Sequence, residues 1–240
     1  MRNKNRINVL SKYIPIITLS MISLLLLCFY FQSKVGATDN LEKLGSLFSI
    51  SWETVHNGHF PRLFTANLFH VNLGHLLSNL VGLLFFSSLL EIIVGKSRVT
   101  LIILLSALGG TIGSLLFHMV DWMVGASTIL FGVYGGLGIL ILRYRRELQR
   151  YFITAVISWC IGLVLMATLG YMSLAQVDQG AHVGGIIAGI LATWILVYPY
   201  SITEVNRPLG LKATILLVTL LAGFGLSFIK EVVLLFPLVV

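Results

Sequence analysis

Four polar side chains that could perform chemistry lie within long apolar stretches of the sequence. They are His75 and Asn79 in one stretch, Ser127 in a second and His182 in a third. A hydroxyl beside an imidazole is the arrangement of nucleophilic catalysis, with the imidazole as general base. Side-chain N–H groups such as those of Asn79 and His75 can stabilise the oxyanion that forms when a carbonyl is attacked. These residue types could serve acyl transfer if the fold brings the serine and the histidine together.

The positions of these residues along their stretches predict a shared depth. Asn79, Ser127 and His182 each precede the end of their stretch by about sixteen residues, which places them roughly 24 Å from that end at about 1.5 Å per residue. If the three stretches cross a bilayer in the same direction, the side chains lie at one level, several Å inside the outer hydrocarbon boundary. Ser127 and His182 could then meet on neighbouring helices.

Glycines are spaced to let the two helices that carry the serine and the histidine approach closely. His182 shares a helical face with Gly185 and Gly189, and Gly132 and Gly136 form a small-xxx-small pattern in the stretch that carries the serine. That stretch is short, so the serine is expected at a helix N-terminus. There its backbone N–H lacks an intrahelical partner and can serve as a further oxyanion donor.

The stretches that must position these residues have the length and composition of membrane spans. The 240 residues are 57% hydrophobic and 10% charged, with a mean hydropathy of +0.96, whereas soluble domains are about a quarter charged. A run of roughly 20 apolar residues crosses the hydrocarbon core. The candidate runs are 13–31, 73–94, 99–119, 126–142, 151–171, 181–198 and 211–236. We therefore expect an all-α polytopic membrane protein with almost no chain left for a soluble domain.

The basic residues predict how the chain is threaded through the membrane. Of the sixteen Lys and Arg residues, twelve precede the first run or lie in every second gap after it. These twelve are Arg2, Lys4, Arg6, Lys12, Lys96, Arg98, Arg143, Arg145, Arg146, Arg150, Arg207 and Lys212. By the positive-inside rule the N-terminus is cytoplasmic and the C-terminus outside, in what we expect to be a bacterial plasma membrane. The net charge of +7 then reflects contact with membrane lipid headgroups and not with nucleic acid.

The same pattern divides the chain into three parts. Residues 1–12 form a cytoplasmic N-terminal tail, 13–200 a membrane domain with an outer loop at 32–72, and 201–240 a loop and an accessory C-terminal transmembrane helix. The outer loop is unusually apolar and includes Trp52. It is expected either to lie in the membrane interface, where amphipathic aromatic residues are favoured, or to pack as a hydrophobic loop on the spans.

Four motifs, in order along the chain, resemble those of the rhomboid intramembrane proteases. They are His70-Val-Asn-Leu-Gly-His75-Leu-Leu-Ser-Asn79, then Glu91 at the end of the same span, then Gly125-Ala126-Ser127 followed by Phe131-Gly132, and lastly Gly180-Ala181-His182-Val183-Gly184-Gly185 with Gly189. Arg62 stands where the family keeps an arginine in its first outer loop. The resemblance extends from about Gly58 to Gly189, over half the chain.

The resemblance implies a rhomboid-like six-helix bundle, here with one additional C-terminal transmembrane helix. It also implies a serine endopeptidase that cuts transmembrane segments of other membrane proteins near their outer end. The catalytic group would be a dyad of Ser127 and His182 without an acidic third member. Asn79 and His75, together with the Ser127 backbone N–H, would form the oxyanion hole.

Further site residues follow from the same resemblance. Gly125 belongs to the nucleophile motif, and Phe131 would stack on the catalytic histidine. His70, Arg62 and Glu91 are expected to support the site as structural anchors, with His70 organising the outer loop. Helical spacing places His70, five residues before His75, roughly 140° around the same helix and nearer the surface. Two positions depart from the family pattern. Thr128 follows the serine where glycine is usual, and Pro61 precedes the arginine where tryptophan is usual.

Other classes of intramembrane protease lack support in the sequence. It contains no HExxH motif, and Asp121 and Asp178 lie at span ends, so neither a metal site nor a pair of catalytic aspartates is expected. No cofactor is expected either. Two alternatives remain, a catalytically inactive rhomboid-like protein that binds membrane clients and a small transporter. The sequence gives no indication of the oligomeric state.

Overall fold

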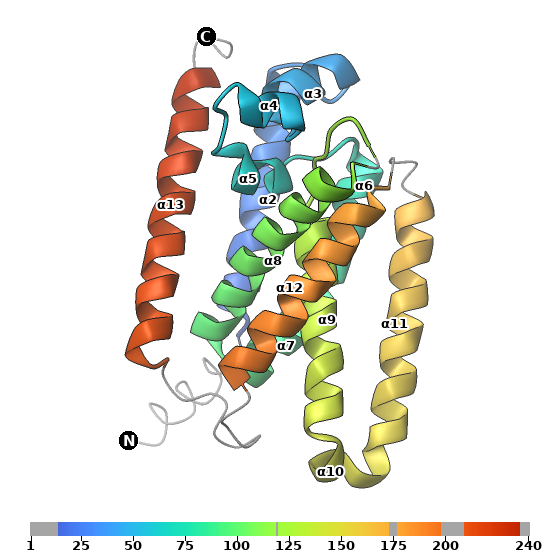
Figure 1. Cartoon of the computed structure of the whole chain (residues 1–240). Helices are drawn as coiled ribbons and strands as arrows, with labels where there is room; N and C mark the ends of the chain where they lie inside the picture. Colours follow the sequence, from blue (N-terminus) through green and yellow to red (C-terminus); the bar gives the residue numbers. More distant parts are fainter. Residues whose placement is uncertain (1–13, 119, 173–176, 198–208, 236–240) are drawn as a thin grey trace, which may run out of the picture.

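Long apolar helices lie side by side through most of the molecule (Figure 1). The computed structural model describes residues 14–118, 120–172, 177–197 and 209–235. Among these residues, six helical segments are long and apolar enough to cross a membrane, and a further apolar helix of 17 residues is shorter. The long elements are α2 (Ile16–Lys34), α6 (Leu73–Gly82) with the π-helix η2 (Leu83–Ser87) and α7 (Ser88–Val94), α8 (Lys96–Phe117), α9 (Ser127–Arg143), α11 (Phe152–Met172), α12 (Gln179–Val197) and α13 (Leu211–Leu235).

These elements confirm the predicted all-α polytopic fold, because each expected apolar run coincides with a helix to within a few residues. Length and apolar character were sufficient to locate them. Residues 1–12 of the expected tail and most of the expected loop before the last helix lie outside the described residues.

The segment expected as the outer loop folds into short helices that cap one end of the bundle (Figure 1). They are α3 (Leu41–Phe48), α4 (Trp52–His56), α5 (Arg62–Thr65) and the 3-10 helix η1 (Ala66–Leu68). Leu44, Phe48 and Ile50 are almost fully buried, whereas Trp52 is 43% exposed. Of the two expectations for this loop, packing on the spans therefore holds for its buried residues. Arg62 fixes the loop from inside, donating hydrogen bonds to the backbone oxygens of residues 46 and 49.

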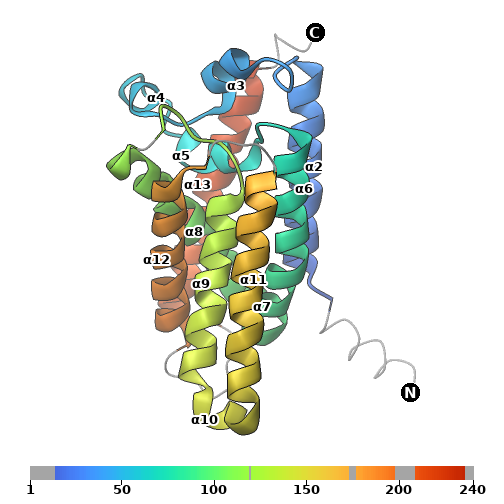
Figure 2. The same cartoon turned by 90° about the vertical axis from the view of Figure 1, so that its right-hand side faces the viewer.

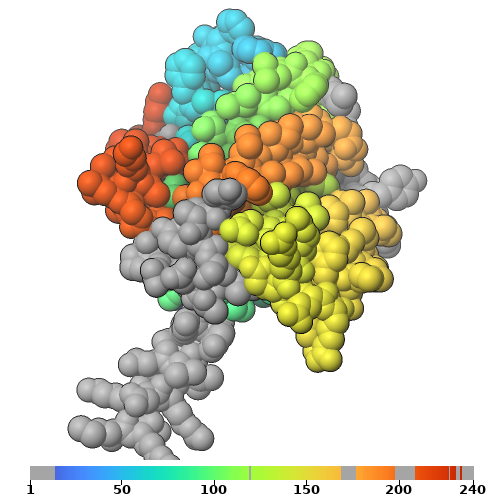
Figure 3. Space-filling model, turned by 60° about the horizontal axis from the view of Figure 1, so that its bottom comes forward, coloured from blue at the N-terminus to red at the C-terminus, as the bar shows by residue number. Residues whose placement is uncertain are grey.

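Helix α12 is packed between α8 and α9. Figure 3, which brings the opposite end of the molecule forward, shows the orange atoms of α12 between green atoms of α8 and yellow atoms of α9. A Cβ atom on Gly189 would collide with the backbone of Gly132, and one on Gly185 with the backbone of Thr128. On the other side, a Cβ on Gly113 would collide with the α12 backbone. The predicted close approach of the helices that carry the serine and the histidine is confirmed.

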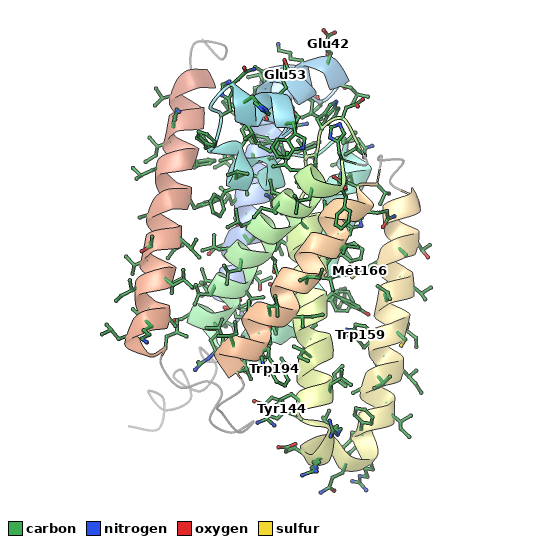
Figure 4. The ribbon with its side chains drawn as sticks, in the orientation of Figure 1. Glu42, Glu53, Tyr144, Trp159, Met166 and Trp194 are labelled. Carbon is green, nitrogen blue, oxygen red and sulfur yellow. The ribbon has the colours of Figure 1, made fainter. Side chains whose placement is uncertain are left out.

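Helices α11 and α13 lie at the periphery of the bundle (Figures 1 and 2). In its most apolar part, α8 is 61% buried, whereas the span Arg145–Thr168, which includes most of α11, is 11% buried and Leu211–Lys230 of α13 is not buried. The short elements α10 (Arg145–Leu148) and η3 (Gln149–Tyr151) connect α9 to α11. The ring of Trp159, labelled in Figure 4, stacks on Tyr134 of α9 with centroids 5.0 Å apart, and its Nε1 donates to the Tyr134 carbonyl at 3.1 Å. This contact holds α11 to the bundle near its middle.

Glu91 of α7 caps the N-terminus of α2. Its carboxylate accepts hydrogen bonds from the backbone N–H of Ile17 at 3.0 Å, and from the N–H and hydroxyl of Thr18 at 2.9 Å each. Pro15 precedes α2 and supplies no side-chain cap of its own. The first N–H groups of a helix lack intrahelical partners, so the buried carboxylate of α7 satisfies them from another helix.

Replacing Glu91 with alanine is expected to lower the free energy of unfolding by about 2–3 kcal/mol, because the N–H groups of Ile17 and Thr18 and the Thr18 hydroxyl lose their acceptor. Thermal or denaturant unfolding of the purified protein in detergent measures this loss. Glu42→Ala is the control, since Glu42 is exposed at the surface of α3 (Figure 4) and its removal should cost less than about 1 kcal/mol. Equal losses for the two variants would contradict the capping role.

Candidate active site

Ser127 is the first residue of α9, and Ala126 is the N-cap residue. No side chain caps this helix at the N-cap position, so the first backbone N–H groups of α9 are available for an external acceptor. The Oγ atom of Ser127 lies 3.0 Å from Nε2 of His182 in the first turns of α12. The structure therefore brings together the two side chains that the sequence singled out as nucleophile and base.

The imidazole of His182 stacks on an aromatic ring, and its backbone is fixed at the start of α12. The ring of Phe131, one turn after Ser127 on α9, stacks on the imidazole with centroids 4.0 Å apart and an interplanar angle of 21°. The backbone N–H of His182 donates to the carbonyl of Asp178 at 3.1 Å. The Asp178 carboxylate accepts from the Ala181 N–H at 3.0 Å and from the Ser114 hydroxyl at 2.5 Å. Asp178 thus caps α12 and binds α8, and these contacts do not make it a third member of a triad.

A cavity of about 840 Å³ adjoins the pair. Ser127, His182, His75 and Asn79 all line it. Asn79 is buried, and its Nδ2 atom has no hydrogen-bond partner among the described residues; the same holds for Nδ1 of His75. The Asn79 amide is a buried donor without a partner in the described part of the chain, which costs free energy, and the side chains of Asn79 and His75 line a space that a ligand can enter. The four residues predicted to carry the chemistry therefore face one cavity.

Gly125 has the backbone conformation and the small size that its place requires. Its φ angle is +127°, a value that residues other than glycine rarely adopt. A Cβ atom would lie 2.7 Å from Cε1 of His75, so the glycine also allows the ring to lie against the backbone. Its N–H donates to the carbonyl of Ala66 at 3.1 Å. Gly125 thus joins the approach to Ser127 to the capping loop.

His70 lies differently from the expectation. We expected it on the same helix as His75, turned to another face, but α6 begins only at Leu73, where Asn72 caps it by accepting the His75 N–H at 2.8 Å. The expectation was wrong because the helix starts later. His70 lies in the preceding loop, fully buried, and its ring meets that of His75 at a centroid distance of 5.1 Å.

His70 makes contacts with both neighbouring segments. Burial, followed by the nearby His75, lowers the pKa of His70 well below its usual range, so Nε2 can accept a hydrogen bond, and it does so from the Ala126 N–H at 3.4 Å. Its backbone N–H and carbonyl both pair with the side-chain amide of Gln32, at 3.1 and 2.7 Å. His70 therefore links α2 to the residue that precedes Ser127.

The remaining predicted residues lie away from the cavity. Neither Arg62 nor Glu91 lines it, and their contacts are those with the capping loop and with α2. Sequence reasoning missed Asn72, Gln32 and Asn67, which all make hydrogen bonds around the site. An asparagine directly before an apolar helix is a recognisable N-cap signal, so Asn72 could have been found. The contacts of Gln32 and Asn67 join residues far apart in sequence, for which no local pattern exists.

Within the described part of the chain, no group of three His, Cys, Asp or Glu residues is arranged to hold a metal ion. The side chains that line the cavity include the Ser127 hydroxyl, the imidazoles of His182 and His75 and the Asn79 amide. Such a set can transfer an acyl group from a carbonyl compound to the serine and then to water.

Comparison with known proteins gives consistent matches. A family model described as Rhomboid domain matches residues 57–199. Rhomboid protease GluP of Bacillus subtilis is 28% identical over 211 residues, which are 88% of this chain and 40% of that protein. RHOMBOID-like protein 2 of Arabidopsis thaliana is 34% identical over 173 residues, 71% of this chain and 53% of that protein. The chain thus spans about two fifths of the first relative and about half of the second.

Proposed function

The chain belongs to the rhomboid family, whose domain matches residues 57–199, and from this membership we propose that it is an intramembrane serine endopeptidase. The observation that carries the proposal is the 3.0 Å contact between Ser127 Oγ and His182 Nε2 on the wall of a cavity inside the membrane bundle. A hydroxyl in this position can lose its proton to the imidazole as it attacks a carbonyl carbon. The substrate would be a peptide bond of another membrane protein.

The proposed reaction has two halves. In the first, Ser127 Oγ bonds to the scissile carbonyl carbon and its proton passes to His182 Nε2. The tetrahedral intermediate then collapses, the C–N bond breaks, and His182 gives the proton to the leaving amine. In the second half, His182 takes a proton from water as the water oxygen bonds to the carbon of the acyl ester. The C–Oγ bond then breaks, and His182 returns the proton to Ser127 Oγ, which releases the new carboxyl group and restores the serine.

The oxyanion of each intermediate needs donors that are already in place. We assign this role to the Asn79 side chain, the His75 ring and the Ser127 backbone N–H. The support is that Asn79 Nδ2 and His75 Nδ1 are buried without hydrogen-bond partners in the described residues, and that both side chains line the cavity with Ser127. Gly125 and Phe131 support the site by making room for the His75 ring and by stacking on His182.

The walls of the cavity suggest how a transmembrane substrate enters. Val81 and Phe85 on the α6–η2 side, and Ile161 and Leu165 on α11, line the cavity and are also exposed at the molecular surface. Figure 2 shows α11 beside α6. We therefore propose that a locally unwound transmembrane segment enters laterally between these two helices, which requires no passage through the capping loop.

The proposed orientation places the cut near the outer end of the substrate. The cavity reaches Leu41 and Trp122, so it lies towards the end capped by α3 and α4. The basic element α10 lies at the opposite end (Figure 1), and the positive-inside rule assigns that end to the cytoplasm. Exposed arginines there, among them Arg145 and Arg146, would contact anionic lipid headgroups of a bacterial plasma membrane. On this proposal residues 13–200 perform the reaction and α13 is accessory.

The alternative of an inactive, client-binding relative is less well supported. The inactive alternative was favoured by Thr128, which departs from the glycine usual in the family at this position. The Thr128 side chain is fully buried and does not line the cavity. The space around Ser127 therefore stays open to a substrate, and the departure gives no reason to exclude activity.

The proposal is tested by reconstituting the full chain in phosphatidylethanolamine and phosphatidylglycerol vesicles with a model single-span substrate. The substrate carries small residues near the outer end of its helix, and the products are sized by mass spectrometry. We expect one cut within that end of the helix with the wild type and intact substrate with Ser127→Ala. Cleavage by Ser127→Ala, or intact substrate with the wild type, would refute the proposal.

A further inference from the structure

Thr128 takes part in a buried chain of hydrogen bonds that joins three elements at the start of α9. The Thr128 hydroxyl donates to Oδ1 of Asn67 in η1. The Asn67 Nδ2 group donates to the Thr111 hydroxyl of α8 at 3.1 Å, and Thr111 donates to the Ala107 carbonyl at 2.9 Å. Thr128, Asn67 and Thr111 are all fully buried. This series of hydrogen bonds therefore runs through the interior, where a polar group left without a hydrogen bond costs free energy.

Neighbouring carbonyl groups fix which atom donates and which accepts in the hydrogen bonds of this series. Nδ2 of Asn67 also faces the carbonyls of Leu63 and Phe64, at 3.4 and 3.2 Å. Carbonyls only accept, so the amide nitrogen must point towards them and Oδ1 must face Thr128. The Thr128 hydroxyl is accordingly the donor that Oδ1 requires. A side chain without this donor would leave a buried carbonyl oxygen unsatisfied.

The rest of Thr128 fills the space between α8 and α12. A Cβ atom on Gly110 of α8 would collide with the Thr128 side chain, and a Cβ atom on Gly185 of α12 would collide with the Thr128 backbone. The threonine therefore occupies a gap that two glycines leave open. Its methyl group and its hydroxyl both fix the first turn of α9, the turn that begins with Ser127.

The segment before α9 is held by the same stretch of the capping loop. The Gly125 N–H donates to the Ala66 carbonyl at 3.1 Å, and the Ala126 N–H donates to His70 Nε2 at 3.4 Å. Residues 125, 126 and 128 thus each bond to a residue between 66 and 70. Ser127 is the member of this series whose side chain turns to His182 instead.

We propose that Thr128 and Asn67 are positioning residues for Ser127: their hydrogen bond, extended to Thr111, holds the first turn of α9 so that Ser127 Oγ stays beside His182 Nε2. This inference rests on the proposed protease function. Neither Thr128 nor Asn67 lines the cavity, so both act through Ser127 and not through contact with the substrate. A displacement of about 1 Å at a reacting group can cost on the order of 10²-fold in rate, so a partial loosening of this turn should slow acylation about tenfold.

The test is the rate constant for covalent labelling of Ser127 by a fluorophosphonate probe, measured on the full chain in lipid vesicles. The labelled amplitude counts competent molecules, and the rate constant reports the reactivity of each one. Thr128→Val keeps the shape but removes the donor, and Asn67→Leu removes the acceptor. Thr193→Val is the matched control. Thr193 is a buried threonine of α12 that takes no part in this series of hydrogen bonds, and its hydroxyl has no partner in the described residues.

We expect Thr128→Val and Asn67→Leu each to lower the labelling rate constant and kcat by about tenfold, with KM unchanged. The double variant should be no slower than the slower single variant, because each substitution breaks the same hydrogen bond between Thr128 and Asn67. Thr128→Ser, which keeps the donor, should have a labelling rate constant within about threefold of the wild type. Thr193→Val should have the wild-type rate constant.

A Thr128→Val protein whose rate constant equals that of the wild type would overturn the inference, even if its labelled amplitude fell, because the residue would then serve stability alone. Multiplying effects in the double variant would overturn it too. Absence of labelling in the wild type would refute the protease function itself. These outcomes distinguish failure of the positioning role from failure of the proposed function.

Discussion

Alanine in place of Ser127 or of His182 is expected to lower kcat for cleavage of a membrane substrate by on the order of 10⁴ to 10⁶, and the double variant is expected to be no slower than either single variant. The reason is that the two groups act as a unit across one 3.0 Å contact. Without the hydroxyl there is no nucleophile, and without the imidazole no group accepts its proton. Once one is lost, the other contributes nothing to the reaction.

Single-turnover cleavage in lipid vesicles measures this effect, with product quantified at long reaction times. His56→Ala is the matched control, because His56 is an exposed histidine of α4 that does not line the cavity, and it should retain the wild-type rate. Independent, multiplying losses at Ser127 and His182 would contradict a shared step. So would a His182→Ala protein that keeps a rate within tenfold of the wild type.

Loss of the Asn79 side chain is expected to have the second-largest effect. Asn79→Ala should lower kcat on the order of 10²- to 10³-fold, the usual cost of removing one oxyanion donor. KM should change little, because the donor is needed where negative charge develops and not in the bound substrate. Asn79→Asp should be at least as slow, since it replaces an N–H donor by a negatively charged acceptor of nearly the same size.

The kinetic constants of both variants are measured against Asn57→Ala, a substitution at an exposed asparagine that follows α4. Unfolding temperatures are recorded in parallel, because a donor without a hydrogen-bond partner in the described residues contributes little to stability and its removal should leave the fold intact. An Asn79→Ala protein with unchanged kcat would show that the oxyanion is stabilised by other groups. A loss that appears in KM alone would assign Asn79 to substrate binding.

Much of the fold was predictable because apolar length is a direct physical requirement of a membrane span. The expected runs at 73–94 and 211–236 match the helical segments Leu73–Val94 and Leu211–Leu235 closely. Gly185 and Gly189 predicted a close helix contact because only glycine lets two backbones approach so far, and the collision of their added Cβ atoms with α9 agrees. Equal distances to the ends of their helices predicted a shared depth for Ser127 and His182, at which the two side chains could meet; they lie 3.0 Å apart.

The supporting contacts were not predictable because they depend on segments that are distant in sequence. Glu91 caps a helix that begins some seventy residues earlier, and no local pattern connects a carboxylate in one span to an uncapped terminus in another. Asn67 meets Thr128 across a similar distance. His70 was misplaced because the helical spacing from His75 was extended back past Asn72, where the helix starts. The Asn67 contact and the place of His70 depend on how the capping loop packs, which a local apolar pattern does not specify.

The most direct measurement for the central claim is the site of covalent modification by a fluorophosphonate. The probe is added to the full chain in vesicles, and the adduct is located by mass spectrometry of the digested protein. One adduct on Ser127 is expected, absent from Ser127→Ala and reduced to background in His182→Ala although the serine is still present. Modification of another residue, or equal labelling of Ser127 without His182, would contradict a serine activated by that histidine.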